Sequence, residues 1–351
     1  MKTDAIYHNG RIITMNSDRS VREAFAVSEG KFTAVGSSDD VLKLAGPDTE
    51  TVNLQQKSVI PGLIDGHGHP LEASVSELDR EIPSPKNVAD ILAWIKRQAE
   101  QAQPGEWILI PRLFPTRNSD FRLPGLSELD SAAPKHPVFL NASYSGVVNT
   151  CALKKSGLLS QPLAEGIETD SAGKPTGIIK RPVFSALQGL PAELSERKQR
   201  MDAARKLFAR YNQAGITGIT DVVHNTEDIK VYQKLGESEH LTVRVYMDYQ
   251  PAKPEHPSET EELAQSIPYR TGKGDISIRM GPYKTVVDGG ILTGTACMRD
   301  PWGQYAAELF GSGTPDSRGT AFYSEEELSE IVRITAEHGW SFTAHVTGDA
   351  A

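Results

Sequence analysis

The first 58 residues alternate short apolar runs with turn residues, a pattern typical of short strands joined by tight turns. Apolar and β-branched residues gather in five runs, at residues 5–8, 11–14, 25–27, 32–35 and 51–54. Asn9-Gly10 and Glu29-Gly30 separate successive runs, and Asn-Gly favours a two-residue hairpin because both turn positions tolerate positive φ. We therefore predict two hairpins and a thin sheet, which needs a partner surface to bury one face.

Beyond this sheet the pattern changes to buried strands that alternate with helices. Five runs have the length and the β-branched enrichment of buried strands: 60–66, 216–223, 242–247, 283–287 and 341–346. A helical spacing of apolar residues over 194–214 is closed by Gly215, a typical C-cap residue. Ser324 starts a capping-box pattern, and Gly339 closes the helix that follows. The alternation predicts an α/β fold with a parallel sheet or barrel.

Residues 70–195 interrupt this alternation as an insertion rich in Pro and Gly. Apolar spacing over 88–95 predicts an amphipathic helix, and the runs 107–110 and 138–140 predict strands. Without the insertion about 165 residues remain after Val59, and a (β/α)₈ barrel uses roughly 31 residues per unit. The chain therefore accommodates about five barrel units.

The composition is that of a globular enzyme. The 351 residues include 37 Lys+Arg and 46 Asp+Glu, which gives a formal net charge of −9, and 38% are hydrophobic. Such a chain can bury a sizeable core and is neither disordered nor collagen-like. The acidic balance argues against nucleic acid or an anionic membrane as a partner, because both favour clustered Lys and Arg. A small-molecule substrate is the expected partner.

Cysteine usage and the N-terminus bear on the compartment. Cys151 and Cys297 are far apart in sequence and lack metal-site or redox spacing, which favours unpaired thiols in a reducing compartment. Charged and polar residues at the N-terminus precede any apolar run, so no secretory segment is predicted. No apolar window approaches the roughly 18 residues of a membrane span. The sequence therefore predicts a cytoplasmic enzyme.

The sharpest candidate for chemistry is the run 65–70, DGHGHP, at the end of the first buried strand. Residues two apart on a strand point to the same side, so His67 and His69 can both reach one point. Neutral imidazole suits Zn²⁺ and related divalent ions. The spacing alone also fits a pair of loop histidines without a ligand role, and it is the preceding apolar run that favours a metal site.

This segment carries a family resemblance. Residues 59–70 (VIPGLIDGHGHP) resemble the signature of the metal-dependent amidohydrolase superfamily. Residues 282–296 (PYKTVVDGGILTGTA) and 345–351 (HVTGDAA) are similar to one branch of it, amidohydrolase family 3, which includes N-substituted formamide deformylases and exoenzyme-regulator-like proteins. Blocks within the insertion match the same branch, so the resemblance covers nearly the whole chain.

The resemblance implies a TIM-type (β/α)₈ barrel beside a small β-sandwich. Residues 1–58 would supply the N-terminal half of that sandwich, and residues 59–351 would form the barrel with its insertion at 70–195. It further implies one or two divalent ions, zinc above all, at the carboxyl-terminal mouth of the barrel. The implied reaction is hydrolysis of an amide or a related non-peptide C–N bond by a metal-activated water.

The resemblance also assigns four metal ligands. His67 and His69 are the implied first-strand ligands, and His345 is the implied fifth-strand ligand. Lys284 is the implied fourth-strand ligand, carboxylated on its amine, because a carbamate offers two oxygens where an ammonium offers none. A salt-bridging or snorkelling lysine is the alternative for this position.

Four further residues are candidates for substrate contacts or for support of the ligands. Asp65 either supports the first-strand histidines or caps the turn, and Asp288 either orients Lys284 or caps the following turn. His224 ends a predicted barrel strand and lines the mouth. Trp302 lies in a segment after the fourth strand, and we predict that this segment forms a lid.

The residue that moves the proton stays unassigned. In the superfamily this is an Asp after the eighth strand, and the sequence stops at Ala351, six residues after His345. The resemblance therefore predicts a barrel truncated after about five units. A catalytically silent scaffold is the alternative, and a metal-dependent isomerase or decarboxylase on the same scaffold is a third hypothesis. The exposed edges of the predicted sandwich also favour a homodimer.

Overall fold

The computed structural model describes residues 2–79, 83–143, 145–160, 162–191, 196–238, 240–251, 256–310 and 314–351. Its internal contacts divide the chain into two units. One comprises Met1–Asp65 and Gln213–Gly218, and the other comprises Gly66–Asn212 and Ile219–Ala351. Within the described ranges no helix is both long and apolar enough to cross a bilayer.

Most of the first unit is β-structure, as the alternating pattern predicts. One sheet has the strand order β5-β4-β1-β6, and a smaller one has the order β3-β2-β7. The elements are β1 (Ala5–His8), β2 (Arg11–Ile13), β3 (Val21–Arg22), β4 (Ala24–Ser28), β5 (Lys31–Gly36), α1 (Ser38–Leu42), β6 (Glu50–Asn53) and β7 (Ser58–Val59). Ile6, Ala24 and Ala26 of the larger sheet share a buried cluster with Val41 of α1. The composite sandwich implied by the resemblance stays a prediction.

The hairpin predicted at Asn9-Gly10 is wrong. Strand β1 pairs with β4 and β6, whereas β2 pairs with β3 and β7 in the other sheet. Asn9 has a positive φ of 55°, but Gly10 donates its N–H to the Glu23 carbonyl at 3.0 Å. A Cβ on Gly10 would lie 2.5 Å from the Leu54 side chain, so glycine is needed for close approach. Because both edges of β1 are paired by other strands, the Asn-Gly turn carries the chain between sheets.

The second predicted hairpin is confirmed. Strands β4 and β5 pair antiparallel, with Ser28 opposite Lys31 across the Glu29-Gly30 turn. Glu29 has a φ of 50° and Gly30 a φ of 71°. Positive φ at both positions is what a tight two-residue turn of this twist requires.

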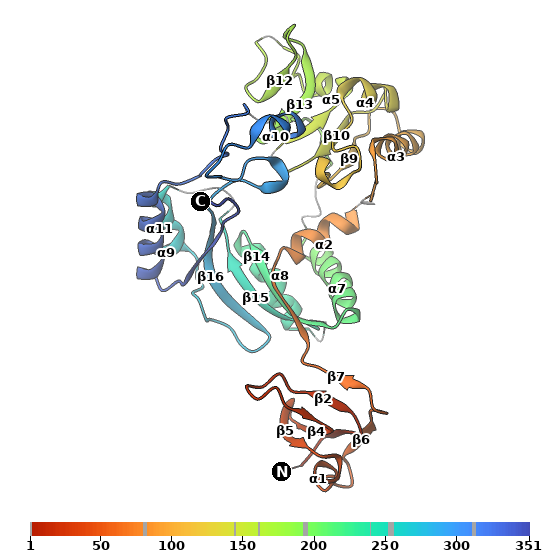
Figure 1. The fold of residues 1–351 in the computed structure, drawn as a ribbon, viewed down its shortest axis with the longest axis vertical. Helices are drawn as coiled ribbons and strands as arrows, with labels where there is room; N and C mark the ends of the chain where they lie inside the picture. Colours follow the sequence, from red (N-terminus) through yellow and green to blue (C-terminus); the bar gives the residue numbers. More distant parts are fainter. Residues whose placement is uncertain are drawn as a thin grey trace. The chain divides into compact units, whose positions relative to one another are not determined.

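The five strands predicted beyond the first sheet all form, and they assemble in one sheet of order β17-β16-β15-β14-β8. They are β8 (Leu63–Gly68), β14 (Ile216–Val223), β15 (Arg244–Tyr249), β16 (Ile278–Val286) and β17 (Phe342–His345). The pairs β15–β16 and β16–β17 are parallel, and Val286 lies opposite His345. The α/β class is therefore confirmed, with a curled parallel sheet in the form of a half barrel (Figure 1).

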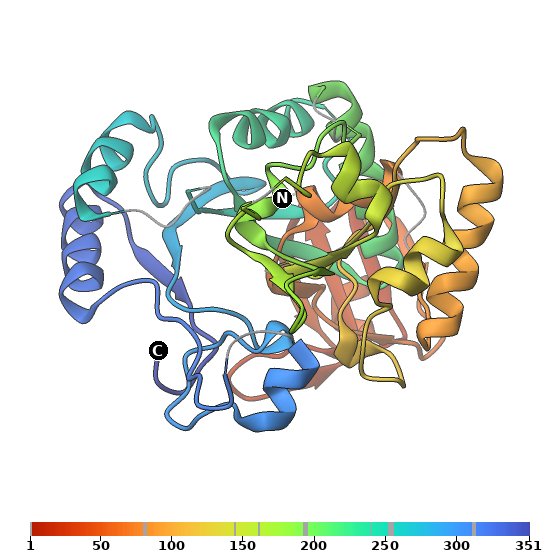
Figure 2. The ribbon, with the colours of Figure 1, turned by 90° about the horizontal axis from the view of Figure 1, so that it is seen from above.

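Helices follow the strands of this sheet. They are α7 (Arg197–Gln213), α8 (Thr226–Gly236), α9 (Pro257–Ser266), η2 (Ile291–Thr293), α10 (Gly303–Phe310) and α11 (Glu325–Glu337). Ser324 and Glu327 form the predicted capping box of α11. Gly215 and Gly339 have φ values of 82° and 79°, as expected for residues that close α7 and α11. Helices α9 and α11 lie side by side in both views (Figures 1 and 2).

The insertion contains a second sheet of order β12-β13-β11-β10-β9. Its elements are α2 (Pro70–Asp79), α3 (Val88–Gln101), β9 (Ile108–Ile110), η1 (Pro115–Arg117), α4 (Leu126–Ala132), β10 (Val138–Asn141), β11 (Ser145–Val148), α5 (Thr150–Lys155), β12 (Ile167–Thr169), β13 (Pro175–Lys180) and α6 (Arg181–Phe184). Val138 and Leu140 of β10 face one apolar cluster, and Phe139 between them faces another. Both faces of this sheet are therefore covered, which explains the unbroken apolar run at its centre.

Candidate metal centre

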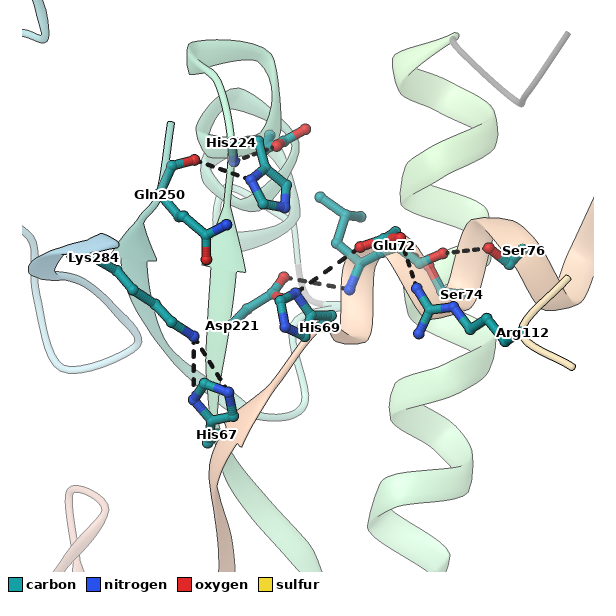
Figure 3. A network of polar contacts seen from close by, with 12 residues as sticks. His67, His69, Glu72, Ser74, Ser76, Arg112, Asp221, His224, Gln250 and Lys284 are labelled. Atoms are coloured by element: carbon teal, nitrogen blue, oxygen red, sulfur yellow. Dashed lines mark hydrogen bonds and ion pairs between the residues drawn. The ribbon is translucent and has the colours of Figure 1, made fainter. Parts of the chain in front are cut away.

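His67 and His69 lie at the carboxyl end of β8, as predicted. His67 is the penultimate residue of the strand. His69 lies between the end of β8 and the start of α2 at Pro70. The two ring centroids are 5.9 Å apart and the ring planes are nearly perpendicular, at 88°. Each ring therefore faces a different set of neighbours (Figure 3).

The neighbour of His67 is Lys284 on β16. The Lys284 side chain is only 2% exposed, and its Nζ lies 3.2 Å from His67 Nε2 and 3.4 Å from Nδ1. Burial lowers the pKa of Lys284, and the nearby Asp248 and Asp221 act in the opposite direction. Burial therefore favours the neutral amine, whose lone pair is available for reaction.

His345 completes this side of the centre. It ends β17, its side chain is exposed, and its ring stacks on His67 with a centroid distance of 5.7 Å. In the sheet order β8 lies four places from β17 and three from β16. In a flat sheet these offsets would correspond to about 19 and 14 Å at roughly 4.8 Å per strand. The short contacts of His67 with His345 and Lys284 therefore depend on the curl of the sheet.

The neighbours of His69 are His224 and Glu72. The His69 and His224 rings stack at a centroid distance of 6.3 Å with an interplanar angle of 13°. One ligand atom from each of the three residues lies within 4.8 Å of the others. Glu72 Oε2 is 3.9 Å from His69 Nδ1, while Oε1 accepts a 2.6 Å hydrogen bond from Arg112. Burial lowers the pKa of His69 to about 4, and Glu72 opposes this shift.

His224 directly follows β14 and is held there by the Asp228 carboxylate and the Gln250 carbonyl. Its N–H donates to Asp228 at 2.8 Å, and its Nδ1 lies 2.9 Å from the carbonyl oxygen of Gln250. A carbonyl oxygen only accepts, so Nδ1 carries the proton and Nε2 keeps a lone pair. Metal-binding histidines are commonly oriented in this way.

Two buried carboxyl groups lie behind these side chains. Asp221 Oδ2 accepts from the Leu71 N–H at 3.3 Å and from the Tyr232 hydroxyl, and burial raises the pKa of Asp221 to about 8. Burial raises the pKa of Asp248, on β15, to about 6, and the nearby Lys284 lowers it. Asp221 Oδ1, Asp248 Oδ1 and His69 Nδ1 are buried without a hydrogen-bond partner among the described residues.

The remaining predicted residues have other surroundings. The Asp288 carboxylate accepts the N–H groups of Cys297, Thr347 and Gly348 at 2.7 to 2.8 Å, so it caps the loops after β16 and β17. Trp302 donates its indole N–H to the Ala296 carbonyl at 3.0 Å. Asp65 is half-buried on β8.

Sequence reasoning missed Glu72 and Asp248, and it gave His224 only a supporting role. Glu72 falls within the predicted insertion, where no strand end marked it. Its spacing of three residues from His69, in the helix that Pro70 starts, is the signal that points to it. Asp248 lies at the carboxyl end of a predicted barrel strand, the position that marks functional residues in such folds.

The side chains present fit a divalent cation. Several imidazoles, a buried amine and carboxyl groups converge on the same strand ends, and imidazole with carboxylate oxygen is a common donor set for zinc and related ions. The buried polar atoms without partners are costly unless another group satisfies them. A bound cation would satisfy the His69 nitrogen.

A cavity of about 290 Å³ lies beside the loop that follows β16. It is lined from the insertion by residues that include Leu123, Val147 and Ile178, and from η2 and the end of α10 by residues that include Leu292 and Phe310. This lining is largely apolar, and its size suits part of a small organic molecule.

Comparison with known proteins gave consistent matches. The model of the amidohydrolase family matches residues 50–351. An N-substituted formamide deformylase of Arthrobacter pascens is 25% identical over 359 residues, covering 99% of this chain and 64% of the relative. The exoenzymes regulatory protein AepA of Pectobacterium carotovorum is 23% identical over 369 residues, covering 99% and 74%. The chain thus spans less than two thirds of the length of the deformylase.

Among solved structures, an uncharacterized metal-dependent hydrolase from Pyrococcus horikoshii OT3 superposes with a TM-score of 0.66. The two sequences are 20% identical, and the match covers 99% of this chain and 65% of the other. At this identity the likeness concerns the fold alone.

Proposed function

The chain belongs to the amidohydrolase family, and we propose that the protein hydrolyses an amide or a related non-peptide C–N bond of a small molecule with a bound divalent metal. The observation that carries the proposal is the contact of buried Lys284 with His67, which stacks on His345. Strands far apart in the sheet bring these residues together, and burial disfavours the ammonium form of Lys284. The similarity to a deformylase supports an amide as the substrate.

The candidate ligands are His67, His69, Lys284 and His345, and their donor set favours zinc. When bound, such an ion polarises a carbonyl group and acidifies water. The four side chains come from the carboxyl ends of β8, β16 and β17 or directly follow them. The metal would therefore lie where catalytic groups of barrel enzymes are found.

Lys284 contributes through the uncharged form of its amine, which burial favours. The amine lone pair attacks CO₂, a C–N bond forms, and the nitrogen loses one proton to solvent. The product is a carbamate with two oxygens and one negative charge. Burial, which disfavours the ammonium, favours this product once a cation is present to balance its charge.

The histidines hold lone pairs toward the site. His69 stays uncharged at neutral pH, because burial lowers its pKa to about 4. Its buried Nδ1 lacks a hydrogen-bond partner among the described residues, so a cation gains a ligand there without competing with a proton. The carboxylate that transfers protons to the leaving amine is unassigned in this chain, and the resemblance places it after an eighth strand.

The apolar cavity supports a small organic substrate. It is bounded by the insertion, by η2 and by the end of α10, and Trp302 lies in the loop that joins η2 to α10. Substrate selection by these two segments is consistent with the predicted lid. A cytoplasmic location, a homodimer and the absence of macromolecular partners remain predictions from composition and resemblance.

The test is metal content and turnover of the whole protein. Metal would be measured by mass spectrometry of the purified protein after supplementation with zinc, cobalt or manganese. Turnover would be measured on a panel of N-formyl and N-acyl amines in ¹⁸O-water. We expect bound metal, release of an amine and one ¹⁸O in the acid product.

Variants assign the activity to the site. His67→Ala and Lys284→Ala should lose both metal and turnover, whereas His240→Ala, an exposed histidine, should retain both. Absence of metal above background in the supplemented protein would contradict the proposal. Metal uptake without any turnover would favour the catalytically silent scaffold, and product without solvent oxygen would favour an isomerase or decarboxylase.

A further inference from the structure

The cavity of about 290 Å³ between the insertion and the segment after β16 combines apolar walls with a neutralised charge. We propose that this space, here called the substituent cavity, binds one substituent of the scissile amide and selects an uncharged, apolar group. Glu128 enforces the selection, because it holds the Arg122 guanidinium of the cavity wall in an ion pair. The inference rests on the proposed function and deepens it, since it names the class of substrate.

The lining of the substituent cavity is mostly apolar. Leu123 and Ile178 contribute to it from the insertion, and Leu292, Leu309 and Phe310 contribute from η2 and α10. Helix α10 lies beside the strands of the insertion (Figure 1). At about 30 Å³ for each non-hydrogen atom, the cavity holds roughly ten such atoms. A cyclic or branched hydrocarbon group fits this space, whereas a charge without a partner would be strongly disfavoured there.

Two hydroxyl groups of the lining already donate to carbonyl groups of the protein. Thr176 Oγ1 donates to the Glu168 carbonyl at 3.2 Å, and Thr293 Oγ1 donates to the Gly290 carbonyl at 3.0 Å. Among the described residues of the lining, Ser145 supplies the remaining hydroxyl. A polar substituent would therefore exchange its bonds to water for few partners in the cavity.

Arg122 is the charged residue of the lining within the described part of the chain. Its two terminal nitrogens donate to the two Glu128 oxygens at 2.7 and 2.9 Å. Glu128 also accepts the Gly125 N–H at 2.8 Å, at the start of α4. This two-point contact leaves the pair without net charge, so a carboxylate substituent would have to displace Glu128 in order to bind Arg122.

The aromatic part of the wall is held in place before any ligand binds. Gly294 has a φ of 66°, and a Cβ at this position would lie 2.3 Å from the Phe310 ring, so the ring packs directly on the glycine. Trp302 meets Phe310 edge to face at a centroid distance of 6.0 Å. The Trp302 indole N–H donates to the Ala296 carbonyl at 3.0 Å. An ordered wall of this kind binds an apolar group with little loss of side-chain entropy.

The insertion wall of the cavity is connected to the candidate centre through Arg112. Pro115 lines the cavity three residues after Arg112, and Arg112 donates to Glu72 at 2.6 Å. Glu72 Oε2 lies 3.9 Å from His69 Nδ1. Three residues of chain span at most about 10 Å, so this wall begins close to the His69 side of the centre.

The opposite wall is connected to the same strand ends through Asp288. Leu292 follows Asp288 by four residues, which span at most about 14 Å. The Asp288 carboxylate accepts the N–H groups of Thr347 and Gly348, just after His345. The substituent cavity therefore lies between two segments that are both anchored at the candidate centre, where the amide of a bound substrate would lie.

The test is the binding of three matched amides to the metal-free whole protein, measured by isothermal titration calorimetry. The probes are N-cyclohexylacetamide and its derivatives with a carboxylate or an ammonium group on the ring. The neutral amide should bind at least about 10-fold more tightly than either charged one, because an unpaired charge loses its water in an apolar cavity. The metal-free protein keeps this measurement independent of turnover.

Three substitutions should change this preference. Leu292→Asp places a carboxylate on the wall, so the neutral amide should bind at least about 10-fold more weakly and the cationic amide should become the tightest ligand. Leu292→Asn, of the same shape without the charge, should weaken the neutral amide without favouring the cationic one. Glu128→Gln keeps an oxygen for the Gly125 N–H but leaves Arg122 without a counter-ion, so the anionic amide should bind about 3- to 5-fold more tightly.

Matched controls make the same changes away from the cavity. Glu330→Gln disrupts a comparable two-point contact, with Arg333 on α11, and Leu44→Asp replaces an exposed leucine of the first unit. Both controls should bind the three amides as the wild type does. Circular dichroism and thermal melting of each variant exclude loss of folding as the cause.

The outcomes separate this inference from the proposed function. Equal affinities for the three amides, no detectable binding of the neutral amide, or wild-type affinities in Leu292→Asp would each overturn the inference. If the amides bind as expected but the metal-loaded protein cleaves no amide of the panel, the selection of an apolar ligand stands and the proposed hydrolysis fails. If the protein cleaves amides with a kcat/KM that Leu292→Asp leaves unchanged, the proposed function stands and this inference fails.

Discussion

The two sides of the candidate centre are built in different ways. On the His67 side the candidate ligands contact one another: Lys284 touches His67, and His345 stacks on it. On the His69 side two neighbours of His69 are held by other groups, Glu72 by Arg112 and His224 by the Gln250 carbonyl. The His67 side centres on a buried lysine, and burial destabilises the charged form of its amine. The His69 side contains side chains whose hydrogen bonds orient their lone pairs.

This difference indicates which structural elements position the side chains on each side. The His67 side depends on the curl of the parallel sheet, because its members come from strands that are far apart in the sheet order. The His69 side depends on neighbouring elements, because His69 and Glu72 are three residues apart and His224 directly follows β14, the strand next to β8 in the sheet. Changes to the loops after β16 and β17 should therefore affect the first side more than the second.

The largest effect is expected from Lys284→Met, which keeps the apolar stem and removes the amine. Loss of a direct ligand should weaken metal binding on the His67 side by at least about 100-fold, the upper end of the effect of an outer contact. Removal of a buried amine should not lower the melting temperature of the metal-free protein. Metal titration and calorimetry test this, with exposed Lys230→Met as the control.

If Lys284→Met binds metal as the wild type does, Lys284 is a structural lysine and the comparison between the two sides fails. A melting temperature well below that of the wild type would instead indicate that the ammonium is stabilised in the folded protein.

The next effect is expected from Asp288→Ala. This carboxylate accepts three backbone N–H groups, from Cys297, Thr347 and Gly348, and it is fully buried. Unsatisfied buried N–H groups cost about 1 to 3 kcal/mol each, so the free energy of unfolding should fall by roughly 3 to 5 kcal/mol. Chemical denaturation measures it.

The control for this variant is Asp275→Ala, because Asp275 also accepts two backbone N–H groups but is exposed. Asp275→Ala should lower the free energy of unfolding far less than Asp288→Ala does. Equal effects of the two substitutions would show that the capping by Asp288 does not order the His345 side.

An effect that is smaller per pH unit concerns Asp221, which accepts the N–H of Leu71 beside the His69 side. Burial raises the pKa of Asp221 to about 8, so between pH of about 4 and about 8 the folded protein keeps a proton that the unfolded chain releases. Stability should therefore fall as pH rises through this window, by at most about 1.4 kcal/mol per pH unit. Asp221→Asn should lack this contribution.

Thermal melts of the metal-free wild type and Asp221→Asn at pH 5, 6.5 and 8 provide the measurement. The melting temperature of Asp221→Asn should rise relative to that of the wild type as the pH rises. Parallel melting curves at all three pH values would show that Asp221 titrates normally in the folded state.

The smallest effect is expected for the stability of Glu72→Gln. Its ion pair with Arg112 is about half exposed, and such pairs contribute roughly 0 to 1 kcal/mol. The free energy of unfolding of the metal-free protein should therefore change by less than about 1 kcal/mol. A large loss of stability would assign Glu72 a structural role instead.

Much of the fold could be predicted from local patterns. The period-two runs located β1 and β14 to the residue, and the Ser324 capping box located the start of α11. These elements depend on neighbours in the sequence. The Asn9-Gly10 hairpin failed because the partners of β1 are β4 and β6, and strand pairing depends on the whole sheet.

The sequence by itself determined the α/β class, the strand ends that carry His67, His69, Lys284 and His345, and the family resemblance. It did so because strands, caps and motifs are encoded over a few adjacent residues. Only the tertiary structure decided which of these side chains meet. The curl of the sheet brings Lys284 to His67 across intervening strands, and α2 turns Glu72 toward His69 and His224. The contacts of Lys284 with His67 and of His224 with His69 join distant parts of the chain, and no local pattern records them.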